Sequence, residues 1–325
     1  MSKKALRHRL YKQYSTNFSL MKSVPGIDIQ PDVPGSIACP ICLCLLDESD
    51  LVDSQVITLD HVPPSSLGGR DADGVLLCST CNHQLGSKVD AQLLRTTEAD
   101  RFAKGHPGIP VDGKLSIGPS TGVAAEMQYT APGALTIFLD KSRSDPSQFT
   151  NMIQHLESAS QKTPFSGRLE FRGGRKANSE VGLLRIGYLL LFRAFGYAAI
   201  LTEGMNAVRA QIMSPDERVI TQSWELPHSF SSTLPPGISM IVAPKELCSF
   251  LAVFDLDVAG VTSRHAVVLP VPDHPDGGVY DRLDRAMNRK EKTRVEGIPV
   301  SPGPRIWTDK EAFLAVYRYC RLCKN

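Results

Sequence analysis

Two hydrophobic patterns alternate along this chain, one typical of strands and the other of helices. Apolar and polar residues alternate through 56–62 (VITLDHV), and a short apolar run follows at 75–77. Alternation rich in β-branched residues indicates a strand, whereas residues 82–94 place apolar positions at helical spacing. The segment 56–94 therefore predicts a strand, a loop broken by Pro and Gly, a second strand and a helix.

After residue 112 the alternating pattern returns in two groups, separated by a long apolar segment. Gly and Pro mark the turns between the short runs, which favours antiparallel sheets. Strands are predicted at 114–118, 123–130, 134–140, 167–172, 218–226, 237–244, 248–257 and 264–272, and helices at 146–160 and 279–295. The predicted fold class is α+β, with a mixed α/β C-terminal region of antiparallel sheets after the first strand and helix unit.

The longest apolar segment, residues 179–201, has the length of a membrane span but contains Arg185 and Arg193. An arginine at the centre of a span costs about 2.5–3.5 kcal/mol in a bilayer. The two arginines are eight residues apart, which places them about 80° from each other around a helix. We therefore expect a largely buried helix in a protein core and no association with a membrane.

Two Cys-x-x-Cys pairs flank the first predicted strand, loop and strand: Cys39, Cys42, Cys78 and Cys81. Each pair suits a tight turn that directs both sulfurs at one point, and four thiolates match the tetrahedral shell that Zn²⁺ prefers. The sequence therefore predicts a structural zinc site. Cys44 is interpreted as a buried thiol outside the ligand set, and Cys320-x-x-Cys323 lacks a matching pair nearby.

Between the cysteine pairs, the first predicted strand ends in Asp60-His61, and Asn82 follows the last cysteine directly. Histidine has the pKa suited to deprotonating a water near neutral pH. Asp and Asn side chains offer hard oxygen ligands, which suit Mg²⁺ or Mn²⁺ rather than zinc. Such an ion offsets the charge that develops when a phosphodiester is hydrolysed. Successive side chains of a strand point to opposite faces, so Asp60 or His61 must sit at an irregular strand end.

Together these motifs resemble the HNH, or ββα-metal, endonuclease family over about residues 39–94, in its subgroup with zinc-binding CxxC pairs. The resemblance implies a zinc-stapled ββα-metal nuclease unit in which His61 is the general base and Asp60 and Asn82 bind a catalytic Mg²⁺ or Mn²⁺. The middle family position, usually Asn, falls on Asp73, a departure that affects the loop orienting His61. Asp90 is interpreted as a helix brace or as part of the ion's outer shell.

The resemblance also implies hydrolysis of DNA phosphodiester bonds, with RNA as an alternative substrate. The predicted helix after Asn82 then lies along the nucleic acid, with most contacts to phosphate rather than to bases. Candidate phosphate contacts belong to this helix and to a Gly-rich loop before the long apolar segment: Lys88, Arg95, Arg172, Arg175 and Lys176. Basic residues also crowd positions 3–22, which are interpreted either as a solvated tail or as a flexible arm that neutralises phosphates.

Composition sets broad limits on the class of protein. A hydrophobic content of 42% and a charged content of 22% are ordinary for a soluble protein. Eight cysteines, half of them assigned to zinc, argue against a secreted disulfide framework. The basic N-terminus lacks a following apolar stretch, so no signal peptide is expected and the expected location is cytoplasmic.

The predicted domains are a basic arm and linker at 1–36, a nuclease domain at 37–105 and a mixed region at 106–325. The last region is expected to be regulatory, or to bind DNA, a partner protein or a ligand. One alternative to a nuclease is a non-catalytic zinc-binding adaptor for nucleic acid or protein. A further one, based on analogy alone, is a nuclease of bacterial defence that stays latent until triggered.

Overall fold

The computed structural model describes residues 2–24, 27, 29–52, 55–70, 73–118, 120–158, 166–171, 173–271, 278–288, 294–319 and 321. The chain forms two compact units. Unit 1 comprises Met1–Asp90, Ala177–Asp257 and Val261–Asn325, and unit 2 comprises Ala91–Lys176 and Val258–Gly260. The boundaries expected at residues 36 and 105 do not coincide with these units, because the first 90 residues cluster with the C-terminal half of the chain.

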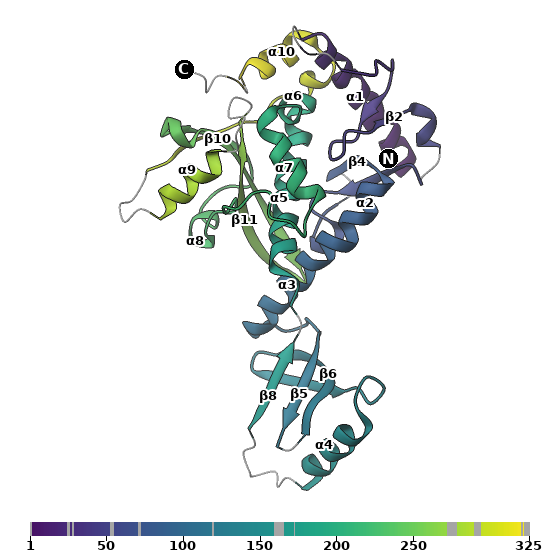
Figure 1. Ribbon diagram of the computed structural model, residues 1–325, viewed down its shortest axis with the longest axis vertical. Coiled ribbons are helices and arrows are strands. Elements are labelled where there is room, and N and C mark those ends of the chain that lie inside the picture. The colour runs from purple at the N-terminus through teal and green to yellow at the C-terminus, as the bar shows by residue number, and fades with distance from the viewer. Residues whose placement is uncertain are drawn as a thin grey trace. The chain divides into compact units, whose positions relative to one another are not determined.

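In unit 1, the segment bounded by the cysteine pairs folds as a hairpin followed by a helix (Figure 1). β3 (Ile57–His61) pairs antiparallel with β4 (Gly74–Cys78). α2 (Ser79–Leu85) starts directly after β4 and continues through one π-helical turn, η4 (Gly86–Asp90). The order of strand, loop, strand and helix predicted for 56–94 is confirmed.

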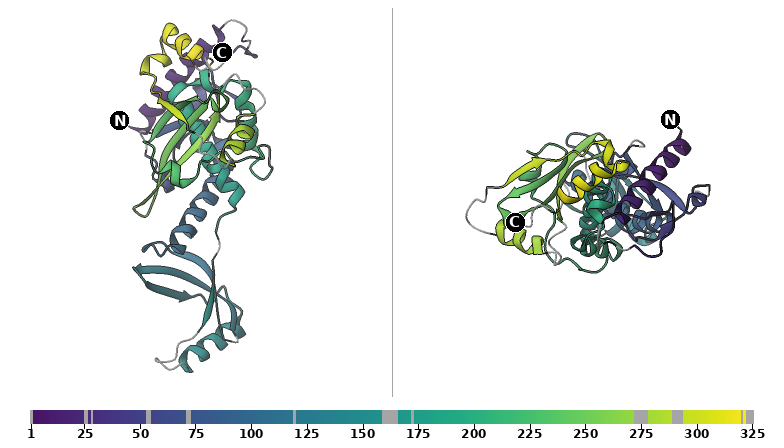
Figure 2. Two further views of the ribbon diagram at one scale, coloured as in Figure 1. Left: turned by 90° about the vertical axis from the view of Figure 1, so that its left-hand side faces the viewer. Right: turned by 90° about the horizontal axis from the view of Figure 1, so that it is seen from above.

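The basic N-terminal segment is a helix, α1 (Lys3–Lys22), packed into unit 1 beside α10 (Lys310–Tyr319) (Figure 1; Figure 2). Its buried side chains recur at helical spacing: Tyr11, Tyr14, Phe18 and Met21. The ring of Tyr14 stacks on that of Trp307, with centroids 5.3 Å apart. The expectation of a solvated tail or flexible arm is therefore wrong, because the apolar stripe between the basic residues is buried.

α5 (Lys176–Phe195) is the central helix of unit 1, and most of its residues are buried. It packs so closely on the main sheet that a Cβ at Gly187 would lie 3.1 Å from the side chain of Val267. The sequence predicts one helix over 179–201, and this prediction is wrong for its last residues. α5 ends before Gly196, which has a φ of +61°, and the short α6 (Tyr197–Ile200) follows. A positive φ is open to glycine because it has no Cβ.

No helix in the described part of the chain is long and apolar enough to cross a membrane.

The main sheet of unit 1 has the strand order β11-β10-β9-β12, and Figure 1 shows α5 beside it. Its strands are β9 (Gly237–Ala243), β10 (Ser249–Val258), β11 (Val261–Pro270) and β12 (Glu296–Pro299). β9 pairs antiparallel with both β10 and β12. This is the second antiparallel sheet predicted from the alternating pattern.

The strand expected at 218–226 does not form, apart from one isolated bridge at Glu225. The side chain of Gln211 replaces a neighbouring strand, because its Oε1 accepts hydrogen bonds from the backbone N–H groups of Val219 and Ile220, each at 3.0 Å. The end of the segment does lie against β11, because Leu226 N–H donates to Ala266 at 2.9 Å and Val268 N–H donates to Trp224 at 2.8 Å.

Shorter elements complete unit 1. These are β1 (Ile37–Ala38), β2 (Leu45–Leu46), η1 (Glu48–Leu51), η2 (Ser65–Leu67), α7 (Glu203–Met213), α8 (His228–Ser231), η5 (Lys245–Leu247), α9 (Gly278–Met287) and η6 (Pro304–Trp307). α9 confirms the first part of the helix predicted at 279–295 but ends at Met287, and residues 294–295 are not helical.

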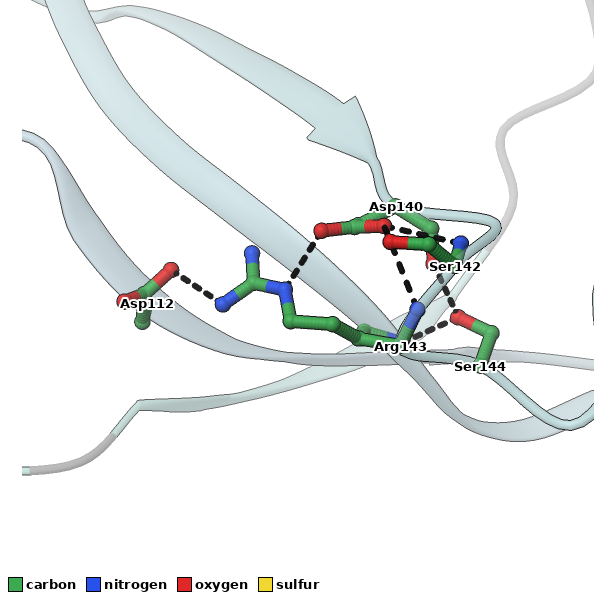
Figure 3. Close-up of polar contacts among 6 residues, drawn as sticks. Asp112, Asp140, Ser142, Arg143 and Ser144 are labelled. Carbon is green, nitrogen blue, oxygen red and sulfur yellow. Dashed lines mark hydrogen bonds and ion pairs between the residues drawn. The ribbon is translucent and has the colours of Figure 1, made fainter.

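Unit 2 is an antiparallel sheet of order β7-β6-β5-β8 with two helices. Its elements are α3 (Ala91–Ala103), β5 (Val111–Ile117), β6 (Ser120–Ala131), β7 (Ala134–Leu139), α4 (Pro146–Ser158) and β8 (Gly167–Phe171). Arg143 braces the loop after β7, donating from Nη1 to Asp112 at 2.9 Å and from Nε to Asp140 (Figure 3). Hydrogen bonds from Ser142 and Arg143 lower the pKa of Asp140 to about 2.

Candidate functional site

The four cysteines of the two pairs meet in unit 1, at the start of the hairpin and helix. The Sγ atoms of Cys39, Cys42, Cys78 and Cys81 all lie within 4.8 Å of one another. The Sγ atoms of Cys42 and Cys78 are 3.6 Å apart. Tetrahedral Zn–S bonds of about 2.3 Å place sulfurs about 3.8 Å apart, so these sulfurs are close enough together to hold a metal ion such as zinc.

The turn carrying the first pair is closed by backbone bonds, with Leu43 N–H donating to Cys39 at 2.9 Å and Cys39 N–H donating to Cys44 at 2.9 Å. Leu43 takes a positive φ of 61° to close it. Cys44 is exposed rather than buried, which corrects the sequence interpretation, and its thiol interacts with those of Cys39, Cys42 and Cys78. Cys320 and Cys323 lie outside the described residues.

Because the thiols lie close together, their pKa values are shifted in different directions. A hydrogen bond from Cys39 lowers the pKa of Cys42 and lowers that of Cys78 to about 3. The same crowding raises the pKa of Cys81, chiefly through Cys39. Four mutually close thiols cannot all ionise without a compensating charge, so this cluster suits a divalent cation.

The residues Asp60 and His61 stand at the end of β3, where the hairpin opens into its loop. In the ladder Asp60 is opposite Val75 and His61 is opposite Gly74, so regular pairing extends through both residues and the irregular strand end expected there is not found. Asp60 is 7% exposed, whereas His61 is partly exposed. Burial raises the pKa of Asp60, and the charge of Arg185 opposes that rise.

Asn82 reaches the same strand from α2. Its Nδ2 donates a hydrogen bond to Oγ1 of Thr58 at 3.1 Å. Thr58 and Asp60 are two residues apart in β3, so their side chains share one face. The structure therefore directs Asn82 to the face of β3 that carries Asp60. The next residue on α2, His83, is exposed.

A buried arginine from α5 joins two carboxylates at this site. Arg185 donates from Nη2 to Oδ2 of Asp60 and from Nη1 to both carboxylate oxygens of Asp90, at 2.8 and 2.9 Å. Burial raises the pKa of Asp90 to about 6. The sequence pattern assigned Arg185 only to a buried helix, because nothing local indicates a partner 125 residues away.

The loop between β3 and β4 is held from the same helix. Nη2 of Arg193 donates to Asp73 at 2.8 Å, and Val62 N–H donates to the backbone oxygen of Asp73 at 3.3 Å. Asp73 thus lies at the base of the loop that follows His61. This placement is compatible with the bracing role expected of it.

The predicted phosphate contacts do not form one cluster in one unit. Lys88 is exposed on η4 in unit 1. Arg95, Arg175 and Lys176 are exposed residues of unit 2, and Arg172 lies outside the described residues. Arg95 lines a surface hollow of unit 2 of about 720 Å³, whose lining also includes both acids and bases, namely Glu98, Asp112, Lys114, Arg143 and Glu170.

Comparisons with known proteins single out the same part of the chain. Residues 44–98 match the family model of the HNH endonucleases. The matched range includes Asp60, His61 and Asn82 and begins after Cys42, so the first cysteine pair lies outside it. No curated protein and no solved structure matches the chain. The match covers less than a fifth of the 325 residues. It supports the HNH endonuclease family for this segment, most of which, up to Asp90, belongs to unit 1.

Proposed function

We propose that unit 1 is a divalent-metal-dependent HNH endonuclease that hydrolyses DNA phosphodiester bonds. One observation carries the proposal: β3 ends in Asp60 and His61, and its Thr58 binds Asn82, all within the segment that matches the HNH family. A base and two oxygen donors are the groups that metal-assisted hydrolysis of a phosphodiester requires.

His61 acts as the general base that takes a proton from the attacking water. As the last residue of β3 it is partly exposed, so its imidazole is accessible to substrate and solvent. Asp60 and Asn82 hold the Mg²⁺ or Mn²⁺ ion. The bond from Nδ2 of Asn82 to Thr58 leaves the amide oxygen for that ion. When bound, the ion stabilises negative charge on the phosphate and the leaving oxygen.

The four clustered cysteines hold a structural Zn²⁺. Cys78 ends β4 and Cys81 lies in the first turn of α2, so the zinc fixes the angle at which α2 leaves the hairpin. The same angle determines where Asn82 meets β3. Zinc therefore acts on catalysis through geometry. Cys44 stays outside the proposed ligand set, which is the group of four clustered cysteines.

The substrate is bound mainly through its phosphates. Lys88 is exposed on η4, six residues after Asn82 in the sequence. It presents a cation close in sequence to that residue. Contacts of this type carry little base information and weaken as salt rises. DNA is the proposed substrate, and RNA is tested beside it.

Nicking of supercoiled plasmid by the full chain, with Mg²⁺ or Mn²⁺, tests the proposal. The wild type and a His228→Ala control, altered at an exposed histidine of α8, should nick at equal rates. His61→Ala should lose at least about 100-fold, the usual contribution of a general base. Equal rates for His61→Ala and wild type would remove His61 from this role.

The competing function is a non-catalytic zinc-binding adaptor. It gains support if the zinc-loaded wild type, with either divalent ion and with single- or double-stranded DNA or RNA, shows no cleavage. Zinc content and circular dichroism of the same samples establish that the protein is folded.

A further inference from the structure

A single cation of α5 occupies the centre of the candidate site. The side chain of Arg185 is 1% exposed, and its guanidinium lies between the carboxylates of Asp60 and Asp90. Asp60 is the last but one residue of β3, and Asp90 ends η4. Arg185 therefore joins three segments of unit 1 through its own hydrogen bonds.

The two carboxylates are used differently. Arg185 bonds to both oxygens of Asp90 but to only one oxygen of Asp60, Oδ2. Both bonds to Asp90 come from the single nitrogen Nη1, so the guanidinium is oriented by Asp90 at Nη1 and by Asp60 at Nη2 together. Nη2 holds Oδ2 of Asp60, and a backbone hydrogen bond from His61 also reaches this carboxylate, so its orientation is fixed from two sides.

Stability alone is a poor reason for this arrangement. Replacing a buried ion cluster with apolar side chains of similar volume is often neutral or stabilising. Here Nε of Arg185 is also buried without a hydrogen-bond partner among the described residues, which costs about 1–3 kcal/mol. A leucine or methionine would fill a helix core without that cost.

The charge of the cluster points toward a cation. One guanidinium and two carboxylates carry a formal net charge of −1, and all three groups are nearly excluded from water. A buried uncompensated charge is unfavourable, and a cation bound at Asp60 would remove the excess. Arg185 thus offsets the charge of one carboxylate, and the remaining net charge of −1 is available to attract a metal ion.

We infer that Arg185 is a positioning residue that fixes the carboxylate of Asp60 for the catalytic ion, with Asp90 as its anchor. The inference rests on the proposed metal-dependent nuclease. On this inference α5 contributes a residue to the proposed active site, although α5 lies outside the segment that matches the HNH family. Lysine cannot replace Arg185, because one ammonium does not reproduce the two directed contacts of a guanidinium.

The test compares Arg185→Met and Arg185→Lys with Arg209→Lys in the full zinc-loaded chain. Arg209 is a matched control because it is a buried arginine of the same unit that bonds to Asn206 and Ile200 instead. The measurements are nicking rate against Mn²⁺ concentration and direct Mn²⁺ binding by electron paramagnetic resonance. Loss of a residue that orients a ligand typically costs about 10- to 100-fold in metal affinity or activity. We expect both Arg185 variants to show that loss and Arg209→Lys to match wild type.

A second variant covers the case in which Arg185 variants do not fold. Asp90→Asn keeps the volume and removes the anchor, so it should raise the half-saturating Mn²⁺ concentration by a similar factor. A folded Arg185→Met or Asp90→Asn protein with wild-type Mn²⁺ dependence overturns the inference. If the wild type binds Mn²⁺ without cleaving, a weaker Mn²⁺ signal in the variants supports positioning while the nuclease proposal fails. If the wild type neither binds Mn²⁺ nor cleaves, both fail.

Discussion

Removing the ring of Tyr14 tests whether α1 is an integral part of unit 1. The side chain of Tyr14 is 1% exposed, its ring stacks on Trp307 at 5.3 Å, and it meets Phe192 edge-on at 4.9 Å. Truncating a buried aromatic side chain to alanine costs about 3–5 kcal/mol. We therefore expect Tyr14→Ala to lower the free energy of unfolding of unit 1 by about that amount.

Tryptophan fluorescence during urea unfolding isolates this effect. The chain has two tryptophans, Trp224 and Trp307, and both lie in unit 1. With a urea m-value of about 3 kcal/mol/M, the midpoint should fall by about 1–1.7 M. Lys12→Ala, on the exposed side of the same helix, should stay within about 0.5 kcal/mol of wild type.

Equal midpoints for Tyr14→Ala and wild type would refute the packing of α1. A broad loss of cooperativity in the Lys12→Ala control would also contradict it, because an exposed lysine has no part in the core. A large shift in Tyr14→Ala alone is the result that the structure requires.

Three further predictions concern the site and its support. Arg193→Met should lower the nicking rate about 10-fold at unchanged zinc content, because the loop after His61 loses its brace; plasmid nicking and metal analysis measure both. Cys44→Ser should retain one zinc per chain by mass spectrometry of the metal, whereas Cys42→Ala should lose it. Gly196→Ala should destabilise unit 1 by at least about 1 kcal/mol, since φ is positive and a Cβ would clash with Asn17; urea unfolding measures this.

Local patterns were sufficient to predict the hairpin, the helix after it and the cysteine cluster. Each depends on spacing within a short stretch, such as the two residues between Cys78 and Cys81 or the alternation before His61. The antiparallel sheets were predictable for the same reason, because turns rich in Gly and Pro separate short strands.

Long-range partners were not predictable. Arg185 and Arg193 were recognised only as polar residues in an apolar helix, and their contacts with Asp60 and Asp73 span 125 and 120 residues. No local signal identifies a partner at that separation. The physical clue was available in part: a buried arginine requires a carboxylate, but the sequence does not say which one.

Two predictions, the solvated or flexible N-terminal segment and the strand at 218–226, were wrong because each relied on one feature of the sequence. The basic residues of α1 concealed the helical spacing of Tyr11, Tyr14 and Phe18, which is an apolar stripe. The alternation near Val219 and Ile220 suggested a strand, although the side chain of Gln211 satisfies their backbone N–H groups. In both cases the residues that contact the segment lie elsewhere in the chain, and the segment's own pattern does not identify them.

The central claim is that Asp60, His61 and Asn82 serve a single cation at the end of β3. Anomalous diffraction from crystals soaked in Mn²⁺ tests it most directly. The account predicts a manganese peak about 2.1 Å from an oxygen of Asp60 and from the amide oxygen of Asn82, the distance typical of Mg²⁺ and oxygen, with His61 facing the same space. Manganese bound elsewhere, with Asp60 contacting only Arg185, would contradict it.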